Sequence, residues 1–431
     1  MKHRREILAI AVPAIVSNIT TPLLSLADVA ITGHIGDAVY LGAIALGGTV
    51  FNTLYWLFNF LRMGTSGLTA QAYGAGDRSL QNLILCRSLA VGAFLGLFLL
   101  VAAGPLGHTI ISFMDSEKAT GTVALCYFNI CIWGAPAVML TYGLSGWFLG
   151  MQNSKAQMWM AITSNIVNLC VSPLLVFGFG WKIEGVATGT VTAQYAGLAV
   201  GAVIVIHKYN PTFSRLGAIL EPKALLSFFR INSDIFLRTA CLVAVTLWFT
   251  HAGALQGTDI LAANALLLQL FMLFSYFMDG FAFAGEALAG KYHGRGDNGS
   301  LCSLIRRLMA IGLYFALAFS IVYGLLGEQI MRLLAEDPAV VDTARRYLPW
   351  AIAIPFCGFL AFIWDGIFVG LVRTRSMLAA MACAIAAFFV VYFALLHILG
   401  NDALWAAFNL YLLLRGLLSA VIGKGLWFTK H

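Results

Sequence analysis

Residues 83–104 read LILCRSLAVGAFLGLFLLVAAG, and this stretch decides the class of fold. Apart from Arg87 near its start, it carries no charge, and its apolar residues cover every face of a helix. A strand of a membrane barrel would instead alternate apolar and polar residues at every second position. About 20 apolar helical residues cross the roughly 30 Å hydrocarbon core of a bilayer. The stretch therefore predicts a transmembrane helix, and residues 186–206 predict another.

The composition of the whole chain agrees with a lipid environment. Of its 431 residues, 60% are hydrophobic and only 10% are charged, whereas soluble domains carry about 25% charged residues. Backbone polar groups inside lipid have to be paired within the protein, which leaves helices or closed barrels. The sequence thus predicts an all-α integral membrane protein.

Hydropathy predicts twelve spans with no soluble domain between them. Their expected ranges are 8–33, 41–66, 83–104, 123–150, 157–178, 186–207, 231–254, 261–286, 303–326, 343–371, 377–399 and 403–427. The longest link lies near 208–230 and holds Pro211 and Pro222. We therefore expect an N-lobe over 1–207, a cytoplasmic linker over 208–230 and a C-lobe over 231–431.

The basic residues predict the orientation of the chain. The formal net charge is +7, and most of the 26 lysines and arginines fall in loops on the side of the N-terminus. The positive-inside rule then places both termini in the cytoplasm. Because these residues are scattered over many short loops, we do not expect a nucleic-acid partner.

The two halves repeat at one constant offset in residue number, without gaps. Gly74-Ala-Gly76-Asp77 corresponds to Gly294-Arg-Gly296-Asp297, and Gly146-Trp-Phe148-Leu-Gly150 corresponds to Gly366-Ile-Phe368-Val-Gly370. Apolar residues match easily by chance, but glycines and charges in loops do not match so readily at the same offset. Six spans per half predict two parallel, pseudo-symmetric six-helix bundles with a cavity between them.

On these features the sequence resembles the multidrug and toxic compound extrusion (MATE) family, and within it the DinF-type branch. The resemblance covers nearly the whole chain, and its segments are 26–36, 64–77, 287–297 and 364–370. It implies a MATE-like fold and efflux of drug-like or toxic compounds, driven by inward flow of H+ or Na+. The expected substrates are organic cations or amphipathic compounds. We further expect a monomer in the inner membrane that needs no cofactor.

Several charged side chains fall inside the predicted spans, where each costs about 3 kcal/mol or more to insert. They point either to ion coupling and substrate contact or to buried ion pairs that hold helices together. The second interpretation pairs Arg62 or Arg238 with a C-lobe acid. The charged residues are Asp28, Asp279, Glu286, Asp365, Arg62, Arg238 and Arg415.

Asp28 is the strongest candidate for coupling. It lies in the outer half of the first span, with no basic residue close to it in sequence. Burial in an apolar bundle disfavours the charged form of a carboxyl group. Such a group can take up a proton on one side of the membrane and release it on the other, and the resemblance also marks this aspartate as the proton or cation site.

The resemblance places partners for Asp28 on the fifth and sixth spans. Asn168 and Thr190 match the family's asparagine and threonine, and they would also complete a Na+ site with Asp28. Four residues after the asparagine the family often has a second aspartate, but this chain has Ser172. One aspartate with Asn168, Ser172 and Thr190 can still hold a proton, so the missing second carboxylate favours a proton over sodium. The alternative is that Asn168 and Thr190 only join helices by hydrogen bonds.

The first span also contains Pro13, at the family's usual position, and Pro22. Proline removes a backbone hydrogen bond and permits a bend. One hypothesis is that protonation of Asp28 bends this helix and expels the substrate, and the alternative is a static kink.

The C-lobe offers less specific candidates. Asp365 corresponds to Ser145 in the repeat, and Asp279 lies seven residues before Glu286 on one helix face. Asp365, Asp279, Glu286 and Arg238 are candidate polar sites of this lobe. The mid-depth glutamate that the NorM-type branch has in its seventh helix is missing, which favours the DinF-type branch.

The sequence-based prediction is a cation-coupled exporter that works by alternating access. A lipid-linked saccharide flippase is an alternative, although it usually needs extra helices or a strongly cationic cavity. A membrane-embedded enzyme would need clustered ligands or a nucleophile with its base, and the eight histidines form no such set. A passive channel would need a polar ring lining a pore, and none is evident.

Overall fold

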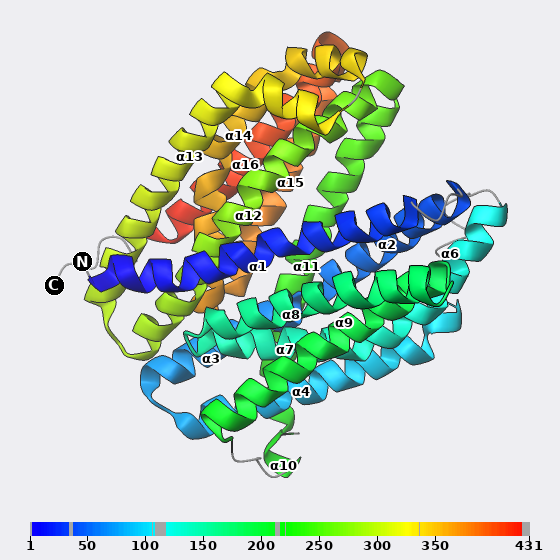
Figure 1. Cartoon of the computed structure of the whole chain (residues 1–431). Coiled ribbons are helices and arrows are strands. Elements are labelled where there is room, and N and C mark those ends of the chain that lie inside the picture. The colour runs from blue at the N-terminus through cyan, green and yellow to red at the C-terminus, as the bar shows by residue number, and fades with distance from the viewer. Residues whose placement is uncertain are drawn as a thin grey trace. The chain divides into compact units, whose positions relative to one another are not determined.

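The computed structural model describes residues 2–33, 38–105, 107, 118–211, 216–219, 221–335 and 337–424. Almost all of them are helical (Figure 1). The helices of the first half are α1 (Lys2–Gly33), α2 (Ala38–Phe58), α3 (Phe60–Ala75), α4 (Arg78–Val101), α6 (Lys118–Cys131), α7 (Ala135–Gly150), α8 (Ser154–Pro173), α9 (Ile183–Ile204) and α10 (Leu216–Ile219). The second half consists of α11 (Pro222–Ala254), α12 (Thr258–Gly294), α13 (Asn298–Leu334), α14 (Pro338–Gly370), α15 (Thr374–Leu399) and α16 (Asn401–Ile422).

Eleven stretches in the described parts of the chain are long and apolar enough to cross a membrane. The remaining predicted span, 8–33, lies within α1, which is a single helix from Lys2 to Gly33. The second of the predicted spans combines α2 and α3, which meet at Asn59, so the stretch runs from Val39 to Ala75. The all-α membrane fold predicted from hydropathy is confirmed.

The helices extend beyond the apolar segments in the second half. The seventh span begins at Pro222 rather than near residue 231, so the end of the expected linker is helical. Proline suits the first turn of a helix because its missing N–H has no partner there anyway. Hydropathy did not reveal this start because the first turns of α11 carry Lys223 and Arg230.

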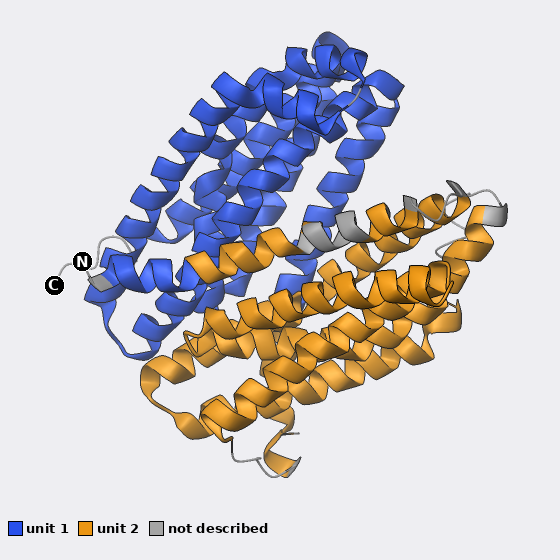
Figure 2. Cartoon of the chain, in the orientation of Figure 1, with its two compact units in different colours: residues 1–11, 233–431 blue, residues 12–232 orange. Residues whose placement is uncertain are grey.

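The described chain divides into two compact units (Figure 2). Unit 2 comprises Val12–Asn232, and unit 1 comprises Met1–Ala11 together with Ser233–His431. The first turns of α1 therefore belong to the unit formed mainly by the second half. Conversely, the first turns of α11 belong to the unit formed mainly by the first half.

The glycines of the repeat allow close helix packing in each unit. In unit 2, a Cβ on Gly146 of α7 would overlap the carbonyl oxygen of Arg62 on α3. In unit 1, a Cβ on Gly366 of α14 would overlap the carbonyl oxygen of Ala282 on α12. Gly366 and Ala282 are the repeat counterparts of Gly146 and Arg62, so the repeat extends to individual backbone contacts.

The glycine-rich turns of the repeat have the same geometry. Gly76 and Gly296 both have φ of +74°, a left-handed conformation that glycine adopts without steric cost. The next residue caps the following helix in each case: Asp77 accepts a hydrogen bond from the Leu80 N–H, and Asp297 accepts one from the Ser300 N–H, both at 2.9 Å. These turns therefore end one helix and begin the next.

Within unit 1, the first turns of α1 are attached to α12 by polar contacts. The carboxylate of Glu6 accepts hydrogen bonds from the Tyr292 hydroxyl and, at 3.3 Å, from the Lys291 ammonium. His3 Nδ1 lies 2.9 Å from the same tyrosine hydroxyl. Partial burial acts to raise the pKa of Glu6, but Tyr292 and Lys291 outweigh it and hold that pKa below its usual 4.5.

Candidate functional site

Three helices of unit 2 bring together the principal residues predicted for coupling. Asp28 comes from α1, Asn168 from α8 and Thr190 from α9. The Asn168 Nδ2 donates to the Thr190 hydroxyl oxygen at 3.1 Å, and the Thr190 hydroxyl lies 3.4 Å from Asp28 Oδ2. Helices α8 and α9 pack along their lengths, which fixes Asn168 and Thr190 relative to each other.

Thr190 has two acceptors for one proton. Its hydroxyl lies 3.4 Å from Asp28 Oδ2 and 3.1 Å from the carbonyl oxygen of Val186, one turn earlier in α9. A hydroxyl group carries a single donor hydrogen and can also accept hydrogen bonds. Thr190 can therefore donate to an ionised Asp28, or donate to Val186 and accept a hydrogen bond from a protonated Asp28.

The Asp28 carboxyl is buried with few partners. The residue is 7% exposed, and Asp28 Oδ1 has no hydrogen-bond partner among the described residues. No Lys, Arg or His in the described ranges forms an ion pair with it. A buried carboxylate needs such partners to offset its lost hydration. The geometry therefore suits a group that is protonated in part of a cycle.

A cavity of about 240 Å³ opens beside this carboxyl within unit 2. Asp28, Thr190 and Gln194 contribute polar atoms to its lining. Its other lining residues come mainly from α2 and α6: Ile44, Ala45, Gly48, Thr49, Phe51, Asn52, Tyr55, Tyr127 and Cys131. One acid and several aromatic rings thus border a space large enough for a small organic group.

Ser172 does not join these contacts. Its side chain is fully buried and faces Gly189 of α9, where an added Cβ would overlap the serine hydroxyl. Its Oγ has no hydrogen-bond partner among the described residues. The small serine therefore permits the close approach of α8 and α9.

The two prolines of the first span lie within one helix. Helix α1 runs from Lys2 to Gly33 through both Pro13, which is buried, and Pro22, which is half-buried. Pro13 lies two residues after Ala11, the last residue of α1 that belongs to unit 1. Pro22 precedes Asp28 by six residues, so a bend there would move the carboxyl relative to the first turns.

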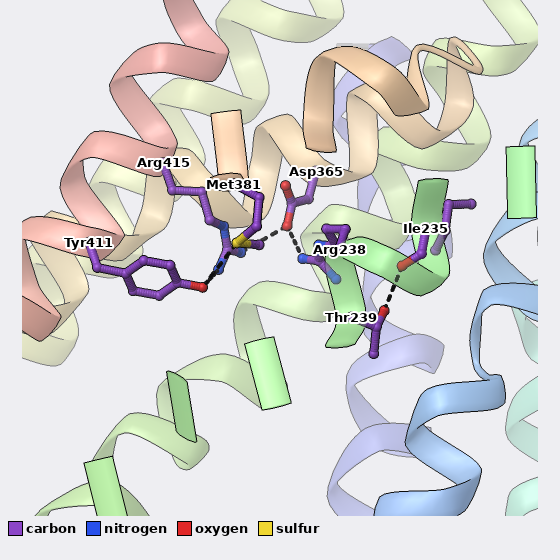
Figure 3. Close-up of polar contacts among 7 residues, drawn as sticks. All are labelled: Ile235, Arg238, Thr239, Asp365, Met381, Tyr411 and Arg415. Atoms are coloured by element: carbon purple, nitrogen blue, oxygen red, sulfur yellow. Dashed lines mark hydrogen bonds and ion pairs between the residues drawn. The ribbon is translucent and has the colours of Figure 1, made fainter. Parts of the chain in front are cut away.

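In unit 1 the structure brings Asp365 between two arginines (Figure 3). Asp365 Oδ2 pairs with the guanidinium of Arg238 on α11 and, at 2.8 Å, with Arg415 Nη2 on α16. Arg238 therefore pairs with a C-lobe acid, as in the ion-pair interpretation of the sequence.

The remaining charged candidates lie elsewhere. Asp279 and Glu286 both lie on α12, where Asp279 is partly buried and Glu286 is 1% exposed. Neither acid takes part in the ion pairs that Asp365 forms in the described structure. Arg62 is buried in unit 2, where its Nε donates to Asn59 Oδ1 at 3.0 Å. This contact spans the junction between α2 and α3.

The aromatic and polar lining of the cavity was not predicted from the sequence. On α2, Ala45, Thr49, Asn52 and Tyr55 recur every three or four residues and so share one helix face. That stripe of small and polar residues in an otherwise apolar span was the signal that could have identified them. Tyr127 lies on another helix and had no such local pattern.

Comparison with known proteins gives consistent matches over the whole chain. The MatE family model matches residues 13–174 and 235–395. DNA damage-inducible protein F of Escherichia coli (strain K12) is 36% identical over 421 residues, which cover 97% of this chain and 91% of that protein. Probable multidrug resistance protein NorM of Thermotoga maritima is 23% identical over 83% of this chain and 77% of its own length.

Solved structures show the same fold at low sequence identity. A crystal structure of MATE in the bent conformation has a TM-score of 0.87 at 17% identity, covering 99% of this chain and 95% of that one. The eukaryotic MATE transporter AtDTX14 has a TM-score of 0.87 at 14% identity, covering 98% of this chain and 96% of its own.

Proposed function

This chain belongs to the MatE family of membrane transporters, and from that membership we propose that it exports small toxic compounds in exchange for protons. Its relatives include proteins named for multidrug resistance and multidrug export, which implies a transporter rather than an enzyme. The observation that carries the proposal is the buried Asp28, which borders a cavity and has no cationic partner in the described structure.

The proposed cycle uses the two hydrogen-bonding states of Thr190. When Asp28 is ionised, the Thr190 hydroxyl donates to Oδ2, and the carboxylate attracts a cationic substrate into the cavity. When Asp28 takes up a proton, its own O–H donates to Thr190, which then donates to the Val186 carbonyl. Loss of the negative charge releases the substrate. Asn168 holds the Thr190 oxygen in place in both states.

A proton suits the donor set better than a sodium ion. The cavity side offers a single carboxylate at Asp28, with the Thr190 hydroxyl and the Asn168 amide oxygen as neutral partners. The chain has Ser172 at the position where the family often has a second aspartate. We therefore propose H+ as the coupling ion, with Na+ at Asp28, Asn168 and Thr190 as the competing possibility.

The cavity lining supports an aromatic or amphipathic cationic substrate. Phe51, Tyr55 and Tyr127 face the same space as the carboxyl, and aromatic faces attract cations by about 0.5–2 kcal/mol. We propose that such compounds bind in unit 2 and that alternating access exposes the cavity to each side in turn. Bending of α1 at Pro13 or Pro22 would couple the protonation of Asp28 to that exposure.

We also propose the setting in which this cycle operates. A multi-pass transporter whose relative is a bacterial protein fits the inner membrane, and the distribution of basic residues favours a cytoplasmic location for both termini. Each unit contains its own candidate charges, so a monomer provides all the groups that the cycle uses.

The test is efflux of ethidium from proteoliposomes under separately imposed proton and sodium gradients. The wild type should respond to the proton gradient alone, and Asp28→Asn should lose that response while still inserting normally. Asp402→Asn serves as a matched control, since Asp402 lies near the start of α16 and outside unit 2. Efflux that is driven by the sodium gradient alone would exclude H+ as the coupling ion. Proton-driven efflux by Asp28→Asn would exclude Asp28 as the coupling site.

A further inference from the structure

Unit 1 contains a buried cluster of charge that the proposed cycle does not use. Arg238, Asp365 and Arg415, which we call the Arg–Asp–Arg triad, come from α11, α14 and α16 and are 9%, 6% and 4% exposed. Both guanidinium groups contact the same carboxylate atom, Asp365 Oδ2 (Figure 3). The two cations therefore converge on one point.

The triad has more positive than negative charge. Arginine stays protonated in proteins, so two guanidinium groups share a single carboxylate. Among the described residues, neither Arg238 nor Arg415 forms an ion pair with any other acid. A buried charge without a counter-charge is costly, because the remaining partner loses its hydration and gains nothing in exchange. The cluster therefore favours an additional anion.

The arginines also have free hydrogen-bond donors. A guanidinium carries five N–H donors, yet the Nε atoms of Arg238 and Arg415 have no partner in the described structure. Among the described residues, Arg415 donates one further hydrogen bond, from Nη1 to the Tyr411 hydroxyl at 3.4 Å. Two buried arginines with unused donors provide the planar, bidentate recognition that carboxylate, sulfonate and phosphate groups need.

Aromatic rings border the triad. The Arg415 guanidinium carbon lies 5.7 Å from the centre of the Phe362 ring and 5.9 Å from that of Tyr411. The Tyr411 hydroxyl in turn lies 3.2 Å from the sulfur of Met381 (Figure 3). Both rings lie within cation–π distance of the Arg415 guanidinium and so place aromatic surface next to the cationic centre.

The triad is a feature of one half and not of the repeat. At the repeat offset, Arg238 corresponds to Asn18 and Asp365 to Ser145, both neutral. The first half therefore packs its corresponding helices with neutral residues at these two positions, and the repeated fold does not itself require the triad.

Conversely, the carboxyl that borders the cavity of the first half has no acidic counterpart in the second half. Asp28 corresponds to Trp248, whose ring packs against Phe389, Tyr392 and Phe393 in unit 1. At the position where the first half has the Asp28 carboxyl, the second half thus has a cluster of aromatic side chains. The two units therefore carry buried centres of opposite charge.

We propose that the Arg–Asp–Arg triad binds the anionic group of an aromatic or amphipathic molecule. Both arginines donate hydrogen bonds to its carboxylate, sulfonate or phosphate, and the rings of Phe362 and Tyr411 contact its apolar part. Asp365 keeps the guanidinium groups together when the site is empty and competes with the bound anion. The same chemistry fits an amphipathic solute or the phosphate of a lipid headgroup.

Substitution of Asp365 separates ligand binding from a purely structural role. Asp365→Asn leaves a neutral side chain of the same shape and raises the charge of the triad from one to two. An anion site then binds its ligand more tightly. If the triad only joined α11, α14 and α16, the same change would lower the stability of the protein and would not change its affinity for anions.

The experiment is a fluorescence titration of the purified full chain in phosphatidylcholine nanodiscs with naphthalene-2-sulfonate. The wild type should bind the sulfonate, Asp365→Asn should bind it several-fold more tightly, and Arg238→Gln and Arg415→Gln should each bind it about tenfold or more weakly, as loss of a charged hydrogen bond implies. Arg332→Gln is the matched control, because Arg332 is exposed and pairs with Glu328 on the surface; it should bind like the wild type.

Three further measurements complete the test. Binding of a naphthalene that carries a trimethylammonium group in place of the sulfonate should be unaffected by these substitutions. Phosphatidylglycerol in the nanodiscs should compete if the natural ligand is a lipid headgroup and should not if it is a solute. If Arg238→Gln or Arg415→Gln fails to fold, lysine replaces that arginine instead of glutamine. Lysine keeps the charge but loses the bidentate donors, so this variant should bind the sulfonate more weakly than the wild type.

Sulfonate affinity that is the same in the wild type and all three triad variants would overturn the proposal, as would weaker binding by Asp365→Asn. The titration uses no gradient, so its outcome is independent of proton coupling. Asp28→Asn should bind the sulfonate like the wild type, even though it fails in coupled efflux.

Discussion

At the scale of single residues, the proposed cycle depends on the hydroxyl of Thr190 to distinguish ionised from protonated Asp28. Its hydroxyl reaches both the carboxyl and the Val186 carbonyl. We expect Thr190→Val, which keeps the shape but removes the hydroxyl, to lower proton-driven efflux about tenfold, as loss of a hydrogen bond to a charged group implies. Thr190→Ser should retain most of the activity in the same proteoliposome assay.

Thr192→Val provides the control on the same helix. Thr192 is exposed, and within the described ranges its hydroxyl donates to the Thr188 carbonyl one turn earlier and not to Asp28. It should transport like the wild type. Equal loss of efflux in the two valine variants would show that the effect comes from α9 and not from the contact with Asp28.

At the scale of helices, the repeat glycines determine how closely neighbours pack. We expect Gly366→Ala to destabilise the protein by about 1–3 kcal/mol, because the new methyl group would overlap the Ala282 carbonyl oxygen and force the backbones apart. The measurement is the midpoint of thermal unfolding in detergent.

Gly324→Ala is the matched control for this prediction. Gly324 also lies within a helix, α13, but nothing lies within 4 Å of the position its Cβ would take. Alanine has the higher helix propensity, so this variant should be as stable as the wild type or more so. A lower midpoint for Gly324→Ala than for Gly366→Ala would contradict the packing argument.

The first turns of α1 depend on the charge of Glu6. Because the Tyr292 hydroxyl and Lys291 hold the pKa of Glu6 below 4.5, its contribution to stability is present at neutral pH. That contribution should be lost as the pH falls through the lowered pKa. Glu6→Gln should therefore be slightly less stable than the wild type at pH 7, by less than about 1 kcal/mol.

Thermal unfolding at neutral and acidic pH tests this expectation. The difference between Glu6→Gln and the wild type should shrink on acidification. Asp342→Asn, which changes an exposed carboxyl on α14, should show no such convergence. A constant difference at every pH would contradict the role of the Glu6 charge.

At the scale of the whole molecule, the constant offset between the two halves made most of the fold predictable. It indicated two six-span halves, whereas the left-handed turns at Gly76 and Gly296 and the close contacts of Gly146 and Gly366 became known only from the structure. Hydropathy fixed the spans because lipid requires long apolar helices. It could not fix the start of α11 at Pro222, since that part of the helix is polar.

The functional groups were predictable only in part. Asp28 was recognisable because a charge in a span is rare, and the resemblance supplied Asn168 and Thr190. The convergence of Arg238 and Arg415 on Asp365 depends on three helices far apart in sequence, and no local pattern encodes it. The assignment of the first turns of α1 to unit 1 is likewise a property of packing.

The most direct test of the account measures protons on the purified protein rather than transport. In weakly buffered detergent solution containing a pH-sensitive dye, addition of ethidium to the wild type should release about one proton per molecule, as Asp28 ionises to bind the cation. Asp28→Asn should release none. Equal release by both proteins, or no release by the wild type over the range of pH in which it transports, would contradict the account.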